Sequence, residues 1–443
     1  MQSDILFQPL HFRSLDVKNR IFRSNISGRF DNYDGSGTQT RINWEVKFAR
    51  GGVGAIVSSF VPVSIRGRIL PNYATIHRDE SIPFWRRLGE AVHEHDCKYI
   101  LQLSHSGRQQ DVGGVENQHL KALSSTSRTE SFHGFRCQAM TTDEIKAAVQ
   151  DFADGARRAR AAGLDGVELH GANGYLITQF LSSGINDRRD EYGGSLENRA
   201  RFALEIVRAI RREVGSDFHL QMKISAVDYN NAVIPWEKPG NTLAESVQVC
   251  QWLEAAGVDA IHVSTGSLFP HPRNPVGGFP ADDTLRTYDS ILSSGIYALR
   301  NYLMLRVPVG QQIFRLLWNR ARGSVIEGVN LDHARAIKQA VSVPVICTGG
   351  FQTASLIRRA VNEGACDAVS IARSLIANPD LVQIFASGKD RPDNPCTYCN
   401  KCLVNVLENP LGCYELSRFG GDYDAMMRQV MSVFEPAEVE HHA

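Results

Sequence analysis

One pattern of apolar and polar positions recurs along the chain: a helical stretch, a glycine turn and then a short apolar strand. It is clearest at residues 162–170 and 256–264, where Ala-Gly leads through an aspartate into the strand. A glycine at this place ends a helix, because it adopts a left-handed conformation without steric cost. Helical periodicity precedes both turns, at residues 142–161 and 243–255. Helices and strands therefore alternate, which predicts parallel strands joined by crossover helices.

The number of apolar strand candidates narrows the fold class. There are eight of them, near residues 20–26, 54–60, 98–104, 165–170, 218–224, 259–264, 343–348 and 367–371. Eight such α/β units fit a (β/α)₈ TIM barrel. A doubly wound open sheet is the main alternative. The spacing and the count favour the barrel.

Two segments exceed what a bare barrel needs. Residues 266–330, after the sixth strand, begin as a Pro- and Gly-rich loop (269–280) and continue as an apolar helical stretch with scattered arginines (299–322). An insertion at the carboxyl face of a barrel lies over the active site, which favours a lid. A surface excursion or a homo-oligomer contact explains it equally well. We expect a barrel domain at 1–390 and a Cys-rich extension at 391–443.

Charge and hydropathy limit the possible partners and the compartment. Lys plus Arg is 48 and Asp plus Glu is 48, so the net charge is zero. A dedicated nucleic-acid binder needs a basic face, so we expect no nucleic-acid partner. The first thirty residues hold four arginines, one lysine and no apolar signal segment, and no run of about 18 apolar residues exists. We therefore predict a cytoplasmic protein without a membrane span.

Polar residues cluster where the fourth predicted strand ends, in His170-Gly-Ala-Asn173-Gly-Tyr175. His170 and Asn173 are three apart on a turn, so both side chains can donate to one carbonyl oxygen and stabilise an enolate. Tyr175 can act as a general acid beside them. Each residue alone is more simply explained as a packed core residue. Their clustering at one strand end favours catalysis.

These residues resemble a known family. The run from His170 to Tyr175, then Gln179-Phe-Leu and the segment 186–199 (Asn-Asp-Arg-Arg-Asp-Glu-Tyr-Gly-Gly-Ser-Leu-Glu-Asn-Arg), is similar to the Old Yellow Enzyme family of FMN-dependent ene-reductases on a (β/α)₈ barrel. The resemblance implies that His170 and Asn173 hold the carbonyl of an activated alkene over the flavin. It also implies that Tyr175 protonates the α-carbon and that NADH or NADPH supplies the hydride. No Gly-x-Gly-x-x-Gly fingerprint is present, so reductant and substrate should alternate in one pocket.

The same resemblance implies flavin contacts at other strand ends. Ser27 would touch the ring near O4 and N5, Phe60 would offer backbone contacts, and Gln102 would bond the pyrimidine edge. Lys223 departs from the arginine that the family usually has. It keeps a cation near flavin N1 and C2=O but loses the bidentate fork. Without the family, Lys223 could be a Schiff-base nucleophile.

The last two strand ends predict a phosphate site. Gly349-Gly350 follows strand seven and opens a helix, so backbone N–H groups can approach phosphate oxygens. Arg373 after strand eight supplies a counter-charge, and barrels commonly bind phosphate at these two strands. Ala372-Arg373 stands where the family usually has Gly-Arg. We expect these four residues to hold the FMN phosphate.

Four of the nine cysteines form the cluster Cys396-x₂-Cys399-x₂-Cys402-x₁₀-Cys413. Four thiolates on a short loop can hold a [4Fe–4S] cluster or a structural zinc, and free thiols are the third alternative. The spacing resembles the branch of the family with trimethylamine dehydrogenase and 2,4-dienoyl-CoA reductase, although the last spacing is shorter. Only about thirty residues follow Cys413, too few for that branch's second nucleotide domain. If a cluster is present, an external electron carrier would therefore receive its electrons.

Three further functions remain open. An FMN/iron–sulfur dehydrogenase would oxidise an amine or a saturated substrate and pass electrons to the external carrier. A flavin-free barrel lyase would use Lys223 as its nucleophile, with zinc on the cysteines. A non-catalytic scaffold would use the cysteine loop as a zinc staple. The leading prediction is an ene-reductase.

Overall fold

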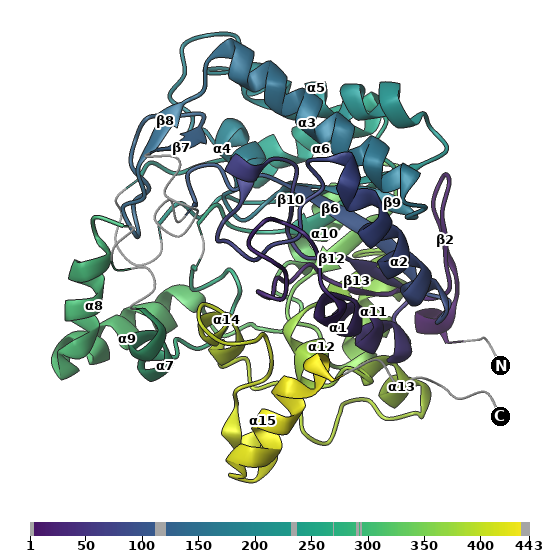
Figure 1. Cartoon of the computed structure of the whole chain (residues 1–443), viewed down its shortest axis with the longest axis vertical. Coiled ribbons are helices and arrows are strands. Elements are labelled where there is room, and N and C mark those ends of the chain that lie inside the picture. Colours follow the sequence, from purple (N-terminus) through teal and green to yellow (C-terminus); the bar gives the residue numbers. More distant parts are fainter. Residues whose placement is uncertain are drawn as a thin grey trace.

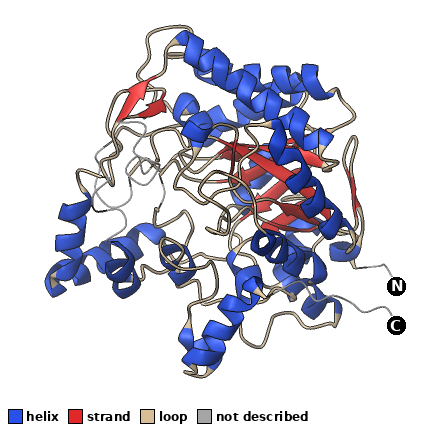
Figure 2. Cartoon of the chain, viewed as in Figure 1, coloured by secondary structure: helices blue, strands red, loops and turns tan. Residues whose placement is uncertain are grey.

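Eight parallel strands close into a barrel at the centre of the molecule, with helices around it (Figures 1 and 2). The computed structural model describes residues 4–110, 121–231, 237–268, 270–288, 292 and 295–435. The barrel strands are β3 (Ile21–Arg23), β4 (Ala55–Val57), β6 (Lys98–Ser104), β9 (Gly166–Gly171), β10 (His219–Ser225), β11 (Ala260–Ser264), β12 (Val345–Thr348) and β13 (Ala368–Ile371). Pairing of β13 with β3 and of β4 with β6 closes the ring. All eight predicted strands and the barrel are confirmed, and the open sheet is excluded.

The helices mostly follow the barrel strands. They are α1 (Gln39–Arg50), α2 (Ile82–His93), α3 (Thr142–Ala161), α4 (Leu176–Leu181), α5 (Leu196–Val214), α6 (Leu243–Ala256), α7 (Ala281–Thr287), α8 (Ala298–Arg306), α9 (Pro308–Arg322), α10 (Leu331–Lys338), α11 (Ala354–Asn362), α12 (Arg373–Ala377), α13 (Leu381–Ala386), α14 (Lys401–Asn405) and α15 (Tyr423–Met431). Helices α3 and α6 confirm the two predicted helical stretches. No helix in the described ranges is long and apolar enough to cross a membrane.

Local signals explain where these helices begin and end. Thr141 with Glu144, and Thr242 with Glu245, form capping boxes at the start of α3 and α6. Each box satisfies two backbone N–H groups that have no partner inside the helix. Gly257 ends α6 at φ +108°, a conformation that a side chain would strain.

The amino end of the barrel is sealed. Strands β1 (Leu10–His11) and β2 (Asp16–Val17) form an antiparallel hairpin. Its apolar side chains pack against inward-facing residues of the barrel, among them Phe22 and Ile346. Two shorter pairings lie elsewhere: β5 (Val61–Pro62) joins β6, and β7 (Ala122–Ser124) pairs with β8 (Cys137–Ala139). The sealed end leaves the carboxyl ends of the strands as the open face.

The insertion and the extension both add short helices. The predicted apolar helix at 299–322 is in fact two helices, α8 and α9, divided at Val307. Pro308 explains the break, because it lacks an N–H and disfavours a helical residue before it. Within these segments, residues 269, 289–291, 293–294 and 436–443 lie outside the described part of the chain. Helix α14 of the extension packs on α7 of the insertion.

Candidate functional site

A cavity of about 360 Å³ lies at the carboxyl ends of the barrel strands. Its inner wall comes largely from six strand ends and is mostly polar, with Ser24, Asn25, Ser27, His170, Asn173, Tyr175, Lys223, Ser264, Thr348, Ala372 and Arg373 among the lining residues. Its outer wall is apolar and comes from the insertion and the extension, through Phe279, Leu305, Phe314, Trp318, Leu403 and Leu407 among others. The cavity therefore joins a polar floor to an apolar mouth.

His170 and Tyr175 lie in contact on this floor, together with Phe60. The ring centroids of His170 and Tyr175 are 4.7 Å apart, and those of Tyr175 and Phe60 are 4.9 Å apart, both edge to face. The Nδ1 atom of His170 is buried and has no hydrogen-bond partner among the described residues. A buried ring nitrogen without a partner costs free energy. This nitrogen therefore has hydrogen-bonding capacity that no described residue uses.

Burial sets the protonation of both groups. Burial, together with the nearby Lys223 cation, lowers the pKa of His170 to about 3, so the ring is neutral at physiological pH. Burial raises the pKa of Tyr175 well above its usual range, so its hydroxyl stays protonated. A neutral imidazole can still donate one hydrogen bond, and a protonated phenol can give up its proton.

Asn173 lines the same cavity in a left-handed backbone conformation, with φ +63°. Its Nδ2 donates to Oδ1 of Asn274 at 2.7 Å. One hydrogen of the amide remains for another acceptor. Asn274 belongs to the insertion, and nothing in the sequence marked it as a partner of Asn173.

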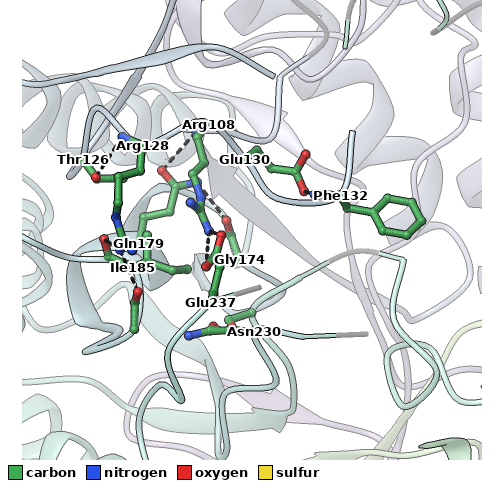
Figure 3. Close-up of polar contacts among 12 residues, drawn as sticks. Arg108, Thr126, Arg128, Glu130, Phe132, Gly174, Gln179, Ile185, Asn230 and Glu237 are labelled. Atoms are coloured by element: carbon green, nitrogen blue, oxygen red, sulfur yellow. Dashed lines mark hydrogen bonds and ion pairs between the residues drawn. The ribbon is translucent and has the colours of Figure 1, made fainter. Parts of the chain in front are cut away.

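Gln179 binds the backbone at Gly174, the residue before Tyr175 (Figure 3). Its Nε2 donates to the carbonyl of Gly174 at 2.8 Å, and its Oε1 accepts the N–H of Arg108 at 3.0 Å. The Arg108 guanidinium donates to both carboxylate oxygens of Glu237 at 2.8 Å, and both side chains are nearly buried. A Cβ on Gly174 would lie 2.0 Å from the Ser267 carbonyl, so only glycine fits there. This part of the motif thus fixes the backbone before Tyr175.

Lys223 reaches the cavity from β10, beside His170 in the strand register. Its Nζ donates to Oδ1 of Asn25 and, at 3.2 Å, to Oγ of Ser24. Burial lowers the pKa of Lys223 to about 8, while the Glu168 carboxylate opposes that shift. The sequence did not predict Asn25 and Ser24 as partners of Lys223. At the end of the first strand it predicted only Ser27 as a site residue.

A buried polar layer lies below this floor inside the barrel, at the level of Glu168, which is two residues before His170 on β9. Glu168 accepts hydrogen bonds from Nε2 of Gln102 at 2.7 Å, from Nε2 of Gln221 and from Nδ1 of His262 at 2.6 Å. Burial alone would raise the pKa of Glu168, but His262, Lys223 and Gln221 together hold it well below its usual range. Gln102 thus directs its amide at Glu168, and its Oε1 has no partner in the described structure. The layer supplies negative charge beneath Lys223.

Of the other predicted flavin contacts, some line the cavity and some lie outside it. Ser27 and Phe60 both line the cavity, and Oγ of Ser27 accepts the Phe60 N–H at 3.0 Å, so that N–H is already engaged. Gly350 has φ +70°, and a Cβ there would lie 2.5 Å from the Ile326 carbonyl. Both Gly349 and Gly350 lie outside the cavity wall, which Ala372 and Arg373 do reach.

Arg373 connects this cavity with the cysteine loop. It lines both the large cavity and a small pocket formed by Cys396, Cys399, Cys402 and Cys413. Its guanidinium donates to Oδ1 of Asn400 and lies 5.3 Å from the ring centre of Tyr398. The end of the eighth strand therefore touches both candidate cofactor sites.

The four cysteines come together around the small pocket, as their spacing predicts. In the described residues, no three His, Cys, Asp or Glu side chains are placed so that together they could hold a metal ion. Tyr398 and Asn400, which lie on either side of Cys399, have φ +55° and +64°. This conformation costs free energy for a non-glycine residue, and residues held in it cluster at functional sites. Four thiols on such a loop form a donor set that suits iron–sulfur or zinc.

Known proteins match most of the chain. A sequence model of the NADH:flavin oxidoreductase / NADH oxidase family matches residues 5–288, and one of dihydrouridine synthases matches residues 316–441. The NADH oxidase of Thermoanaerobacter brockii is 32% identical over 424 residues, which cover 92% of this chain and 57% of that protein. The bilirubin reductase of Mediterraneibacter gnavus is 30% identical over 425 residues, with 95% and 58% covered.

A solved structure agrees with these matches. A 2-naphthoyl-CoA reductase in complex with 2-naphthoyl-CoA superposes with a TM-score of 0.74 at 25% identity, covering 95% of this chain and 58% of that one. The chain thus spans a little over half the length of these three relatives.

Proposed function

Because this chain belongs to the NADH:flavin oxidoreductase / NADH oxidase family, that of the Old Yellow Enzymes, we propose that it uses FMN and NADH or NADPH to reduce the C=C bond of α,β-unsaturated carbonyl compounds. The family match confirms the resemblance drawn from the motif at residues 170–199. One observation carries the proposal furthest: the unpaired, buried Nδ1 of a neutral His170 lies beside a protonated Tyr175.

Each residue of the floor has a defined task. His170 and the remaining amide hydrogen of Asn173 bind the substrate carbonyl oxygen, which polarises the double bond. The Tyr175 hydroxyl donates a proton to the α-carbon. The Phe60 ring holds the rings of His170 and Tyr175 in place from one side. The apolar outer wall excludes water from the substrate.

The residues fit an FMN bound at the strand ends. FMN, when bound, supplies hydride transfer between the nicotinamide and the substrate. Lys223 would place its cation at the flavin pyrimidine edge, positioned by Asn25 and Ser24. Arg373, at the other end of the floor, would hold the phosphate, with Gly349 and Gly350 shaping the backbone beside it. Ser27 would add a ring contact, whereas the Gln102 amide is held by Glu168 and Gln102 does not line the cavity.

An absorption spectrum of the full chain, purified without oxygen, tests the cofactor directly. Oxidised-flavin bands that bleach on addition of NADH or NADPH, and return on addition of 2-cyclohexenone, are the expected result. A chain that stays colourless after incubation with FMN would overturn the proposal and favour the flavin-free lyase based on Lys223. Borohydride trapping of a carbonyl substrate on Lys223 would then identify the lyase.

The cysteine pocket supports a second candidate, an FMN/iron–sulfur dehydrogenase that passes electrons to an external carrier. Cys396, Cys399, Cys402 and Cys413 would hold a [4Fe–4S] cluster, and Arg373 lies between it and the flavin floor. Iron assayed on the same sample, at about four per chain, supports the cluster. If the assay finds about one zinc per chain instead, the cysteines hold a structural zinc and not an iron–sulfur cluster. Turnover of an amine with an artificial acceptor, faster than turnover of an enone with NADH, would favour this candidate.

A further inference from the structure

The helix pair α8–α9 has two apolar faces, and only one of them is covered. Leu305, Phe314 and Trp318 are buried against Phe279 and Leu285. Of the fifteen large apolar side chains exposed in the described part of the chain, ten lie between residues 296 and 325. Figure 1 shows α8 and α9 at the outer edge of the molecule, away from the barrel. The concentration is far greater than the scattered exposure of ordinary surfaces.

The exposed residues follow helical spacing. On α9, Val309 (64% exposed), Ile313 and Leu316 (70% exposed) recur at intervals of four and three. On α8, Leu299 and Leu303 are four apart and each more than half exposed. Residues at such intervals share one side of a helix. Each helix therefore carries a second, continuous apolar stripe that no other described residue covers.

The charge of this segment has one sign. Residues 295–326 contain five arginines and no Asp, Glu or Lys. Arg306 follows Leu303 by three positions, and Arg320 follows Leu316 by four, so each stripe ends in an arginine. Arg315 has one acidic neighbour, Asp282 on α7, at 3.7 Å and in solvent. Because the whole chain is neutral, this is a local excess of positive charge.

We propose that α8–α9 docks on the surface of an anionic lipid bilayer, with the apolar stripes in the acyl boundary and the arginines among the headgroups. Apolar stripes beside basic residues are the requirements of an interfacial helix. An anionic bilayer offers acyl chains for the apolar stripes and negative headgroups for the arginines. A nucleic acid would leave the leucines unmatched. A second copy of the same face would oppose arginine to arginine, which costs free energy.

The docking surface adjoins the mouth of the large cavity. Leu305 of α8, and Phe314 and Trp318 of α9, line that cavity from the covered side, and the partly exposed Met304 lines it as well. The two helices thus separate the cavity from the proposed bilayer surface. Docking itself does not depend on the proposed reaction.

Co-sedimentation with vesicles tests the proposal on the full chain. We expect binding to phosphatidylcholine vesicles that contain about one third phosphatidylserine, weaker binding to pure phosphatidylcholine, and weakening as salt screens the arginines. The double variant Leu303→Glu/Leu316→Glu should weaken binding at least about a hundredfold, because it removes two inserted leucines. Arg306→Gln/Arg320→Gln should weaken binding to the anionic vesicles about thirtyfold, at roughly fivefold per arginine.

A matched control separates docking from general exposure of apolar groups. Tyr423 and Met431 are also exposed, on α15, so Tyr423→Glu/Met431→Glu should bind as the unaltered chain does. All three double variants change exposed side chains and should keep the same melting temperature. Absence of binding to anionic vesicles would overturn the proposal. So would binding that the leucine variant leaves unchanged, or a dimer that this variant dissociates without any vesicle binding.

Discussion

Replacing Tyr175 with Phe removes one hydroxyl from the floor of the cavity and little else. No hydrogen bond to the Tyr175 hydroxyl is present in the described structure, so the substitution strands no partner. The ring contacts with Phe60 and His170 stay, because a phenyl ring fills the same place. We therefore expect the free energy of unfolding to change by less than about 0.5 kcal/mol.

The rate should respond very differently. A positioned general acid contributes about 10²- to 10⁴-fold, which corresponds to about 3–5.5 kcal/mol in the barrier. The loss should appear only in the step that consumes the alkene. Stopped-flow absorbance without oxygen separates the two half-reactions. Reduction by NADH should keep its rate in Tyr175→Phe, and reoxidation by 2-cyclohexenone should slow about 10²- to 10⁴-fold.

Tyr73 supplies the matched control, because it lines the same cavity. Burial raises the pKa of Tyr73 to about 12, so it too is a protonated phenol. If Tyr175 is the acid, Tyr73→Phe should reoxidise at nearly the normal rate. Equal slowing in the two variants, or normal reoxidation in Tyr175→Phe, would refute the assignment of the proton to Tyr175.

Three further predictions concern charge and the cysteines. Burial lowers the pKa of Lys223 to about 8, so its cation is present below that pH and lost above it. Reduction by NADH should slow as pH rises through about 8, and Lys223→Arg should abolish this decline in stopped-flow traces. Burial lowers the pKa of His170 to about 3, so kcat/KM should show no acid limb near pH 6.5; a limb that His170→Gln removes would contradict this. Cys402→Ser should reduce bound iron and leave bound FMN intact, as measured by metal assay and absorbance on one sample.

The barrel was predictable because its signals are local. Several strands follow a helix whose end is marked by a glycine, as Gly257 marks the end of α6. Thr141 and Thr242 mark helix starts three residues before a glutamate. Hydrophobic spacing also predicted a helix at 299–322. It missed the break at Val307, where the apolar pattern continues although Pro308 ends the hydrogen-bond ladder.

The site was less predictable, because its partners are distant in sequence. Asn25 lies 198 residues from Lys223, and Asn274 lies 101 residues from Asn173. Such pairs depend on strand register and loop placement. Glu168 and His262 did carry a signal, since each lies between apolar residues in a strand that is buried along its whole length. A charged residue in such a strand must find a buried partner.

The cysteine loop contributes to the walls of the large cavity, which affects how its variants are read. Nδ2 of Asn400, between Cys399 and Cys402, donates to the Gly278 carbonyl of the insertion at 3.0 Å, and its Oδ1 binds Arg373. Leu403 and Leu407, just after Cys402, line the cavity itself. A cysteine variant could therefore lose activity because the cavity changes shape, without any electron passing through the loop. The redox state of the iron during reduction by NADH separates these explanations. Iron that is reduced on the timescale of turnover requires an electron path, whereas iron that keeps one state assigns the loop to shaping the cavity.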